Sequence, residues 1–257
     1  PPPPPPPPLY RPGDHPHLHK TPRRQRQMCI RDSLSNNHNH PKKIGIIMDG
    51  NGRWAKLNKL KINKGHEKGV GVVRDIVKEC IAQNIESLTI YAFSSENWSR
   101  PQSEINGIKK LIVKAIHEQV PELMEQNVML DFFGDISSWG DEISRKINKA
   151  EDDTFMEYPS LRLNVALGYG GRNDIVSASI RIAEHLKSDL ISTGDIDEDM
   201  IAKFSQVPDD NIDLIIRTGG DKRLSNFLLF QAAYAEIFFV DKLWPDFTRD
   251  DFKNCLD

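Results

Sequence analysis

Short apolar runs alternate with longer amphipathic segments from Pro41 to the end of the chain. Six of these runs are rich in β-branched and aromatic residues and are too short to be helices, so they predict β-strands. The predicted strands span residues 44–48, 87–93, 128–134, 161–169, 213–218 and 236–240.

The segments between the strands carry apolar residues at helical spacing. In 66–84 these are Val70, Val73, Ile76, Val77 and Ile81, and in 104–126 they are Ile108, Leu111, Ile112, Ala115 and Ile116. Pro121 is expected to kink or restart the second of these helices, because proline has no amide hydrogen. Residues 172–189 and 138–156 also read as helices, and the latter is more polar and is expected to face solvent.

Strands that alternate with helical crossovers predict an α/β fold, with a mainly parallel central sheet flanked by helices on both faces. Ligands in such folds bind outside the carboxyl ends of the strands. No glycine- or serine-rich linker divides residues 41–257, so we interpret them as one domain.

Residues 1–40 differ from the rest of the chain in composition. They hold 11 of the 17 prolines and 5 of the 8 histidines and have almost no apolar periodicity, which predicts disorder. A polyproline ligand or a histidine metal tract is the functional alternative. Residues 26–33, RQMCIRDS, resemble the translated end of a sequencing adapter, so we interpret the segment as an artefactual extension.

Charge and composition exclude several classes of function. The net charge of −3 gives no electrostatic case for a nucleic-acid partner. No apolar run reaches the roughly 18 residues of a membrane span. Cys29, Cys80 and Cys255 show neither metal-ligand spacing nor a disulfide framework, which favours a reduced, cytoplasmic setting.

The motif MDGNGR (48–53) directly follows a predicted strand. Gly50 and Gly52 allow backbone amides to approach an anion, and Arg53 offers a planar donor fork suited to diphosphate. Asp49 would repel a bare phosphate, so its presence suggests a bridging Mg²⁺. The alternative is a plain turn between a strand and a helix.

Two further polar motifs follow predicted strands. AFSSENWSRP (92–101) combines hydroxyl, carboxylate, amide and guanidinium groups with one tryptophan, and the alternative is a surface loop that caps a helix before Pro101. IIRTGGDKRLSN (215–226) places Arg217, Arg223 and a hydroxyl around a glycine pair, as a diphosphate site requires. Here the alternative is a turn in which Ser225 or Asn226 caps a following helix.

Two single residues complete the candidate set. Glu236 begins an apolar strand, where a lone acid is usually solvated but could also partner Asp49 at a metal. His66 follows Gly65 near the first motif, although lone histidines are more often structural. Three strand ends with phosphate donors and two carboxylates together suggest two diphosphate substrates held side by side with Mg²⁺.

At the level of whole motifs the chain resembles the cis-prenyltransferases, in particular the bacterial undecaprenyl diphosphate synthases. The resemblance covers roughly Lys42 to Asp257 and rests on motifs in family order: IIMDGNGRWAK, LTIYAFSSENWSRP, LGYGGRNDIV, IIRTGGDKRLSNFLLFQAAYAEIFF and LWPDF.

This resemblance implies a Mg²⁺-dependent condensation of isopentenyl diphosphate onto an allylic diphosphate such as farnesyl diphosphate, with a Z double bond formed at each step. It also implies a homodimer in the cytoplasm, possible contact with the inner membrane surface, and a polyprenyl product delivered to the membrane as a carrier of cell-wall precursors. A non-catalytic relative that serves as a binding subunit is the alternative.

The resemblance assigns roles by position. Asp49 and Glu236 match metal ligands, and Asp49 and Asn97 match catalytic residues. Matches to substrate-binding residues are Gly50, Asn51, Gly52, Arg53, Trp54, His66, Ser94, Ser95, Glu96, Trp98, Arg100, Arg217, Arg223, Leu224 and Ser225.

The chain departs from the family pattern in three places. Ile62 stands where an arginine is usual, with Lys61 or Lys64 as possible substitutes, and Lys222 replaces a common histidine. The family's arginine–glycine tail does not follow Asp257, so the chain is expected to be truncated.

Overall fold

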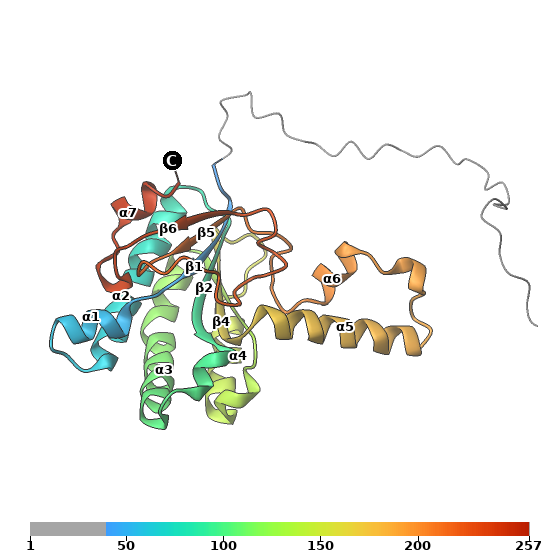
Figure 1. The fold of residues 1–257 in the computed structure, drawn as a ribbon, viewed down its shortest axis with the longest axis horizontal. Coiled ribbons are helices and arrows are strands. Elements are labelled where there is room, and N and C mark those ends of the chain that lie inside the picture. Colours follow the sequence, from blue (N-terminus) through green and yellow to red (C-terminus); the bar gives the residue numbers. More distant parts are fainter. Residues whose placement is uncertain (1–39, 257) are drawn as a thin grey trace, which may run out of the picture. The chain divides into compact units, whose positions relative to one another are not determined.

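The computed structural model describes residues 40–256, and almost all of the extension predicted to be disordered lies outside them. Six strands form one sheet in the order β3-β4-β2-β1-β5-β6 (Figure 1). Every pair of neighbouring strands is parallel. The bounds are β1 (Lys43–Ile47), β2 (Ser87–Ser94), β3 (Val128–Phe133), β4 (Leu161–Tyr169), β5 (Leu214–Arg217) and β6 (Glu236–Phe239). The six predicted strands and the parallel α/β fold are confirmed.

Helices cover the first face of the sheet. Ile44 and Ile46 of β1 belong to the larger apolar core, which includes buried side chains of four helices. These helices are α2 (Ile62–Ala82), α3 (Gln102–Glu125), α4 (Asp141–Thr154) and α7 (Arg249–Lys253). As predicted, α4 is mostly exposed, but it buries Ile143 and Ile147 at a spacing of four residues.

Helix α3 runs through Pro121 without interruption, so the expected restart is wrong. The proline lies on the exposed side of the helix, and so does His117, whose carbonyl would otherwise have accepted the missing amide hydrogen. Because water can satisfy that carbonyl, the helix tolerates the proline at this position.

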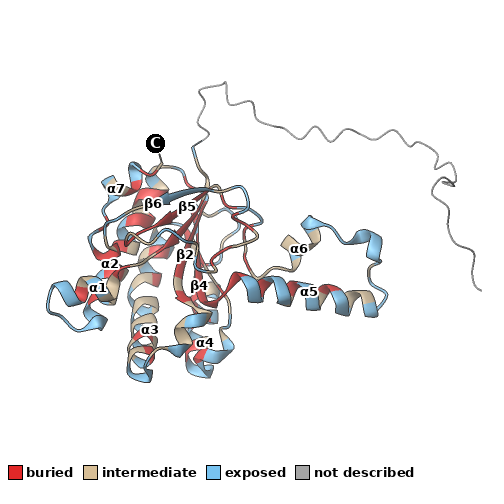
Figure 2. Cartoon of the chain, viewed as in Figure 1, coloured by how far each residue is buried: buried red, intermediate tan, exposed pale blue. Residues whose placement is uncertain are grey.

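A smaller apolar core fills the second face. It joins Ile47 of β1 and Ile215 of β5 to Phe227, Leu228 and other residues of the irregular segment 224–235. Next to it, α5 (Gly171–Lys187) begins at the sheet and runs outward with α6 (Glu198–Phe204), and much of its length is exposed (Figure 2). The short helix α1 (Asn51–Leu57) precedes α2.

Within residues 40–256, no helix is both long enough and apolar enough to cross a lipid bilayer.

Candidate active site

Asp49 lies two residues beyond β1, at the carboxyl end of the sheet. Its Oδ2 accepts a hydrogen bond from Arg217 Nη2 at 2.9 Å, and its Oδ1 is 3.0 Å from Arg53 Nη2. The backbone of Asp49 is fixed as well, because its carbonyl accepts from Thr218 Oγ1 at 2.9 Å and from the Trp244 amide at 3.0 Å. The carboxylate and two guanidinium groups therefore meet at one point, as the motifs predicted.

Two glycines let the loop after β1 come close to the segments after β5 and β6. Gly50 has a φ of 114°, and a Cβ there would lie 2.9 Å from the Leu243 side chain. Gly219 has a φ of 88°, and a Cβ there would lie 2.6 Å from Arg53 Nη2. Both positions need the left-handed backbone and the small size that only glycine combines.

Arg217 is almost fully buried, with 4% of its surface exposed. Its Nη1 donates to Ser225 Oγ at 2.6 Å and to the Arg223 carbonyl at 2.5 Å. Its Nη2 also lies 3.3 Å from Asp221, which in turn pairs with the exposed guanidinium of Arg223. A guanidinium held at this many points is already oriented before an anion arrives.

The loop after β2 forms a 3₁₀ helix over Ser95–Ser99. Asn97 Oδ1 accepts from the Ser94 amide at 3.1 Å, which fixes the orientation of the carboxamide. Glu96 Oε1 accepts from Asn226 Nδ2 at 2.8 Å, so this loop is joined to the loop after β5. Three strand ends that are distant in sequence thus form one continuous surface.

Electrostatics keep the carboxylates of this surface ionised. Burial raises the pKa of Asp49, but hydrogen bonds from Arg217 and Arg53 outweigh it and hold the pKa below its ordinary value. The pKa of Glu96 is likewise lowered, because the Asn226 hydrogen bond and nearby hydroxyl and backbone donors overcome the effect of burial. Both groups therefore carry negative charge at neutral pH.

His66 lies on α2 beside this surface. Burial lowers the pKa of its imidazole below the ordinary 6.5, and the positive charge of Arg100 lowers it further, while Glu104 partly offsets both effects. The neutral ring is consequently the main form at pH 7.

We expect the NMR titration of His66 to show a pKa below 6.5 in the free protein and a higher one with inorganic pyrophosphate bound. Since the folded-state pKa lies below the unfolded value, the unfolded chain binds more protons as pH falls. The contribution of His66 to stability is thus present above about pH 6.5 and is lost as pH falls through the folded pKa. A pKa at or above 6.5 in the free protein would contradict this.

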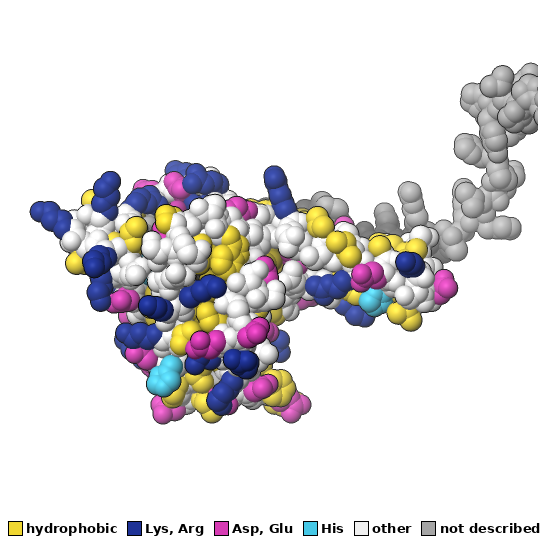
Figure 3. Space-filling model, turned by 90° about the horizontal axis from the view of Figure 1, so that it is seen from below, with side chains coloured by type: hydrophobic (Ala, Val, Ile, Leu, Met, Phe, Trp, Pro, Cys, Tyr) yellow, Lys and Arg dark blue, Asp and Glu magenta, His cyan; other side chains and the backbone are white. Residues whose placement is uncertain are grey.

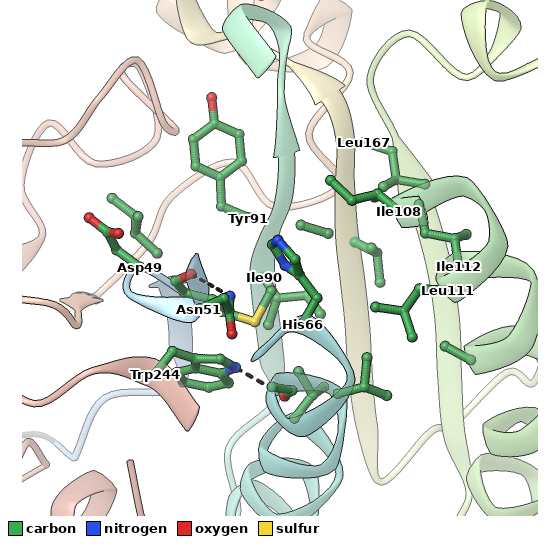
Figure 4. Close-up of a pocket in the computed structure, with 18 of the residues that line it drawn as sticks. Asp49, Asn51, His66, Ile90, Tyr91, Ile108, Leu111, Ile112, Leu167 and Trp244 are labelled. Atoms are coloured by element: carbon green, nitrogen blue, oxygen red, sulfur yellow. Dashed lines mark hydrogen bonds between the residues drawn. The ribbon is translucent and has the colours of Figure 1, made fainter. Parts of the chain in front are cut away.

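The polar surface opens into a cavity of about 870 Å³. Figure 4 shows Asp49, Asn51 and His66 on one side of it and Ile108, Leu111 and Ile112 of α3 on the other. The lining continues along α3 to Val120, Leu123 and Gln126 and reaches Leu130 and Leu163 of the sheet. Beyond this apolar stretch, Lys78 and Glu122 form an ion pair of 2.6 Å between α2 and α3.

Most of the predicted site residues line this single cavity. They are Asp49, Gly50, Asn51, Gly52, Arg53, His66, Ser94, Glu96, Asn97, Arg100, Arg217, Arg223 and Ser225. The cavity has a charged end at these residues, which we call its mouth, and an apolar body. This arrangement suits a ligand with an anionic head and a hydrocarbon tail.

Four predicted residues are not among those that line the cavity. Trp54 donates its indole N–H to Asp246 at 2.8 Å, and Leu224 packs on the smaller core. Trp98 packs edge-on against Phe93 and lies next to Trp139. The Ser95 hydroxyl lies next to Gly170.

Glu236 is not brought to Asp49 within the chain. It pairs with Leu214 at the beginning of β5, whereas Arg217 pairs with Phe239 at the end of these strands. Asp49 lies beyond Ile47, which is the partner of Arg217 in β1. The two carboxylates are thus about five residues apart along the strand direction, on the order of 16 Å, so one ion cannot bridge them.

Some site residues were not predicted. Asp221 connects Arg217 with Arg223, and Asn226 connects two loops. Asn226 was considered only as a helix cap, but the next element after it is strand β6, and Asn226 and Ser225 have positive φ angles of 65° and 49°. The sequence did contain one indication of this turn, because asparagine adopts the left-handed backbone region more readily than most residues.

A divalent metal is compatible with Asp49 at the mouth. In the described part of the chain, no three histidine, cysteine or acidic side chains form a cluster that could hold an ion. Asp49 lines the cavity and keeps 28% of its side chain exposed. Mg²⁺ commonly binds through one carboxylate, waters and substrate phosphates, and this single carboxylate fits that mode.

Comparison with known proteins shows what the chain is similar to. The prenyltransferase family model, which describes undecaprenyl diphosphate synthases, matches residues 47–257. A ditrans,polycis-undecaprenyl-diphosphate synthase ((2E,6E)-farnesyl-diphosphate specific) of Acinetobacter baylyi is 41% identical, over 87% of this chain and 90% of that protein. A Haemophilus influenzae protein with the same description is 44% identical, over 85% and 91%. The crystal structure of lavandulyl diphosphate synthase from Lavandula x intermedia, in complex with dimethylallyl diphosphate, superposes with a TM-score of 0.81 at 31% identity, over 84% of this chain and 94% of that one.

Proposed function

The chain belongs to the undecaprenyl diphosphate synthase family of prenyltransferases, and from that premise we propose how its site works and on which substrates. It is an isoprenyl transferase that adds isopentenyl diphosphate units in Z configuration to an allylic diphosphate. We take farnesyl diphosphate as the primer and undecaprenyl diphosphate as the product. The observation that carries this proposal is the Asp49–Arg217 ion pair at the mouth of an apolar cavity that Arg223 and Asn97 also line.

The mouth binds two diphosphates and orients them. Arg53 and the loop at Gly50 hold the allylic diphosphate, and Arg217, Arg223 and Ser225 hold isopentenyl diphosphate. When the allylic carbon–oxygen bond breaks, negative charge develops on the leaving diphosphate, and guanidinium groups fixed in advance stabilise it. Asp49 would hold Mg²⁺, which when bound adds positive charge at the leaving group.

The side chain of Asn97 is best placed to donate a hydrogen bond to a ligand. Its Oδ1 is engaged by the Ser94 amide, so its Nδ2 is the atom that can reach a ligand in the cavity. A carboxamide is also a weak base at neutral pH. We therefore assign Asn97 the positioning of the substrate diphosphate or a water, while a diphosphate oxygen accepts the proton lost from the condensing alkene.

The non-catalytic alternative is not favoured. The relatives of this chain are described as synthases. In this chain Asp49, Asn97, Arg217 and Arg223 all line the same mouth.

Incubation with radiolabelled isopentenyl diphosphate, farnesyl diphosphate and Mg²⁺ tests the function. We expect labelled polyprenyl products that are extractable into butanol and that depend on the primer. Omitting farnesyl diphosphate is the control. No elongated product from a soluble, folded preparation would overturn the proposed activity.

We also propose that two copies of the chain associate. Helix α5 exposes Val176 and Ile180, both 54% exposed and one helical turn apart. Strand β6 is the edge of the sheet and exposes Phe238, at 44%. Exposed apolar side chains and an unpaired strand edge are both typical of a homodimer interface.

Sedimentation velocity measures this association. We expect a dimer for the parent chain and a monomer for the double variant Val176→Asp/Ile180→Asp, because two buried, unpaired carboxylates would oppose the contact. The matched control is Phe155→Asp/Tyr158→Asp, which alters two other exposed apolar residues and should leave the dimer intact. A monomeric parent chain would contradict the proposal.

We place the enzyme in the cytoplasm, with its product passed to the inner surface of the cell membrane. This location is supported by the apolar cavity, because the polyprenyl chain made there must eventually be released into lipid. Cell fractionation that recovers the enzyme outside the cytoplasmic and membrane fractions would contradict this location.

A further inference from the structure

The end of α1, the start of α2 and the connection between them form an exposed segment with an unusual composition. Residues 56–64, which we call the basic loop, read KLNKLKINK and contain four lysines and no acid. Every residue of the loop is exposed. Three of them are large and apolar, namely Leu57 at 75%, Leu60 at 48% and Ile62 at 44% exposure.

The charge of the basic loop is largely unneutralised. Lys64 pairs with Glu67 at 2.6 Å, but within residues 40–256 no carboxylate forms an ion pair with Lys56, Lys59 or Lys61. Figure 3 shows basic and apolar side chains together at the end of the molecule that carries α1. This end therefore presents positive charge although the chain as a whole has a net charge of −3.

The backbone of the basic loop is ordered by local hydrogen bonds. Asn58 Nδ2 donates to the Trp54 carbonyl at 2.9 Å, and the Leu60 amide donates to the Ala55 carbonyl at 2.8 Å. Lys59 adopts a left-handed φ of 57° between them. The apolar side chains are thus presented outward by a fixed turn, so their exposure is a property of the fold.

The basic loop borders the mouth of the cavity. Ile62 of the loop lines the cavity, as do Arg53 before the loop and His66 after it. Any surface that bound the basic loop would therefore lie next to the mouth of the cavity.

We propose that the basic loop docks on an anionic lipid bilayer. Its lysines face the phosphate head groups while Leu57, Leu60 and Ile62 enter the boundary with the acyl chains, as in other interfacial segments that combine basic and apolar residues. The choice of a membrane over an acidic protein rests on the proposed function, because the product of that reaction is a membrane lipid. The docking itself needs neither substrate nor turnover.

The contrast with a second exposed apolar pair supports a charged lipid surface. Phe155 and Tyr158 are 76% and 83% exposed, but Asp152, Asp153 and Glu157 surround them in the sequence. An anionic bilayer would repel that region, so it serves as an internal control.

Flotation with vesicles of phosphatidylglycerol and phosphatidylcholine tests the proposal on the full chain without substrate. We expect binding to these vesicles, weaker binding at high salt and little binding to pure phosphatidylcholine. The variant Lys56→Glu/Lys59→Glu should lower partitioning at least about 25-fold, since each lysine near an anionic surface contributes about fivefold. Leu57→Ser/Leu60→Ser should lower it about tenfold.

Two matched controls distinguish a specific effect of the basic loop from a general effect of net charge or of exposed apolar surface. Lys146→Glu/Lys149→Glu on α4 changes the net charge equally, and Phe155→Ser/Tyr158→Ser removes equal apolar character, so both should bind like the parent. The segment 1–39 is present in every variant and cannot account for differences between them. Equal partitioning of loop variants and controls, or no parental binding, would overturn the proposal. Prenyl transfer assayed in detergent is read separately, so its presence without vesicle binding would leave the proposed function intact.

Discussion

Replacing Asp49 with alanine is expected to lower kcat by about three orders of magnitude while the fold persists. The carboxylate is the one group that contacts both Arg53 and Arg217, and it is the proposed Mg²⁺ ligand. Without it the two guanidinium groups lose their common anchor, and the leaving diphosphate loses the preorganised positive charge that stabilises it.

The fold should survive because Arg217 keeps other partners. Ser225, the Arg223 carbonyl and Asp221 still accept its hydrogen bonds, so we expect a stability loss of roughly 1–3 kcal/mol. Steady-state kinetics with farnesyl diphosphate, together with thermal unfolding followed by circular dichroism, separates the two effects. Asp250→Ala removes a 91% exposed carboxylate and should change neither quantity. A variant within tenfold of the parent kcat would show that Asp49 does not have this role.

The carboxyl-end rule explains why much of the mouth was predictable. Asp49, Asn97 and Arg217 each follow or end a strand, and parallel strands place those points on the same side of the sheet. The same rule places Glu236 away from Asp49 within one chain. Glu236 begins a parallel strand, so it lies at the opposite end of the sheet from the mouth.

Other features depend on contacts that no local pattern encodes. Glu96 and Asn226 are 130 residues apart in sequence, and only the closing of the sheet brings them together. The resemblance matched Trp98 to a substrate-binding residue, and its ring packs on Phe93 and Trp139. The segment 224–235 has buried apolar residues but does not form a helix. Its positive φ angles turn it back over the sheet.

The apolar body of the cavity is lined by residues whose helical spacing was visible in the sequence. Ile108, Leu111, Ile112, Ala115 and Ile116 were predicted as one helical face, and that face lines the cavity together with residues of the sheet. The spacing indicates a buried face of α3, but it cannot tell a packed core from a space kept open for a ligand, because both require the same periodicity.

Filling this space halfway along α3 is the second large effect that we expect. Lining residues run from Glu104 to Gln126, a helical length of about 33 Å, and Ala115 lies about 16 Å from the first of them. A growing polyprenyl chain that enters at the mouth must pass Ala115 to reach Val120 and Leu123. A tryptophan at position 115 would therefore block the passage, since interiors are too closely packed to let a chain slide by.

Ala115→Trp should release products shortened by several five-carbon units, while the first condensations, which take place at the mouth, keep near-parental rates. Thin-layer or liquid chromatography of the dephosphorylated products measures this, and Ala115→Phe should give an intermediate length. Glu118→Trp is the matched control, because it adds the same ring three residues away on the exposed side of α3 and should leave product length unchanged. If Ala115→Trp folds and still makes full-length product, the growing chain does not follow α3, and the body of the cavity has another use.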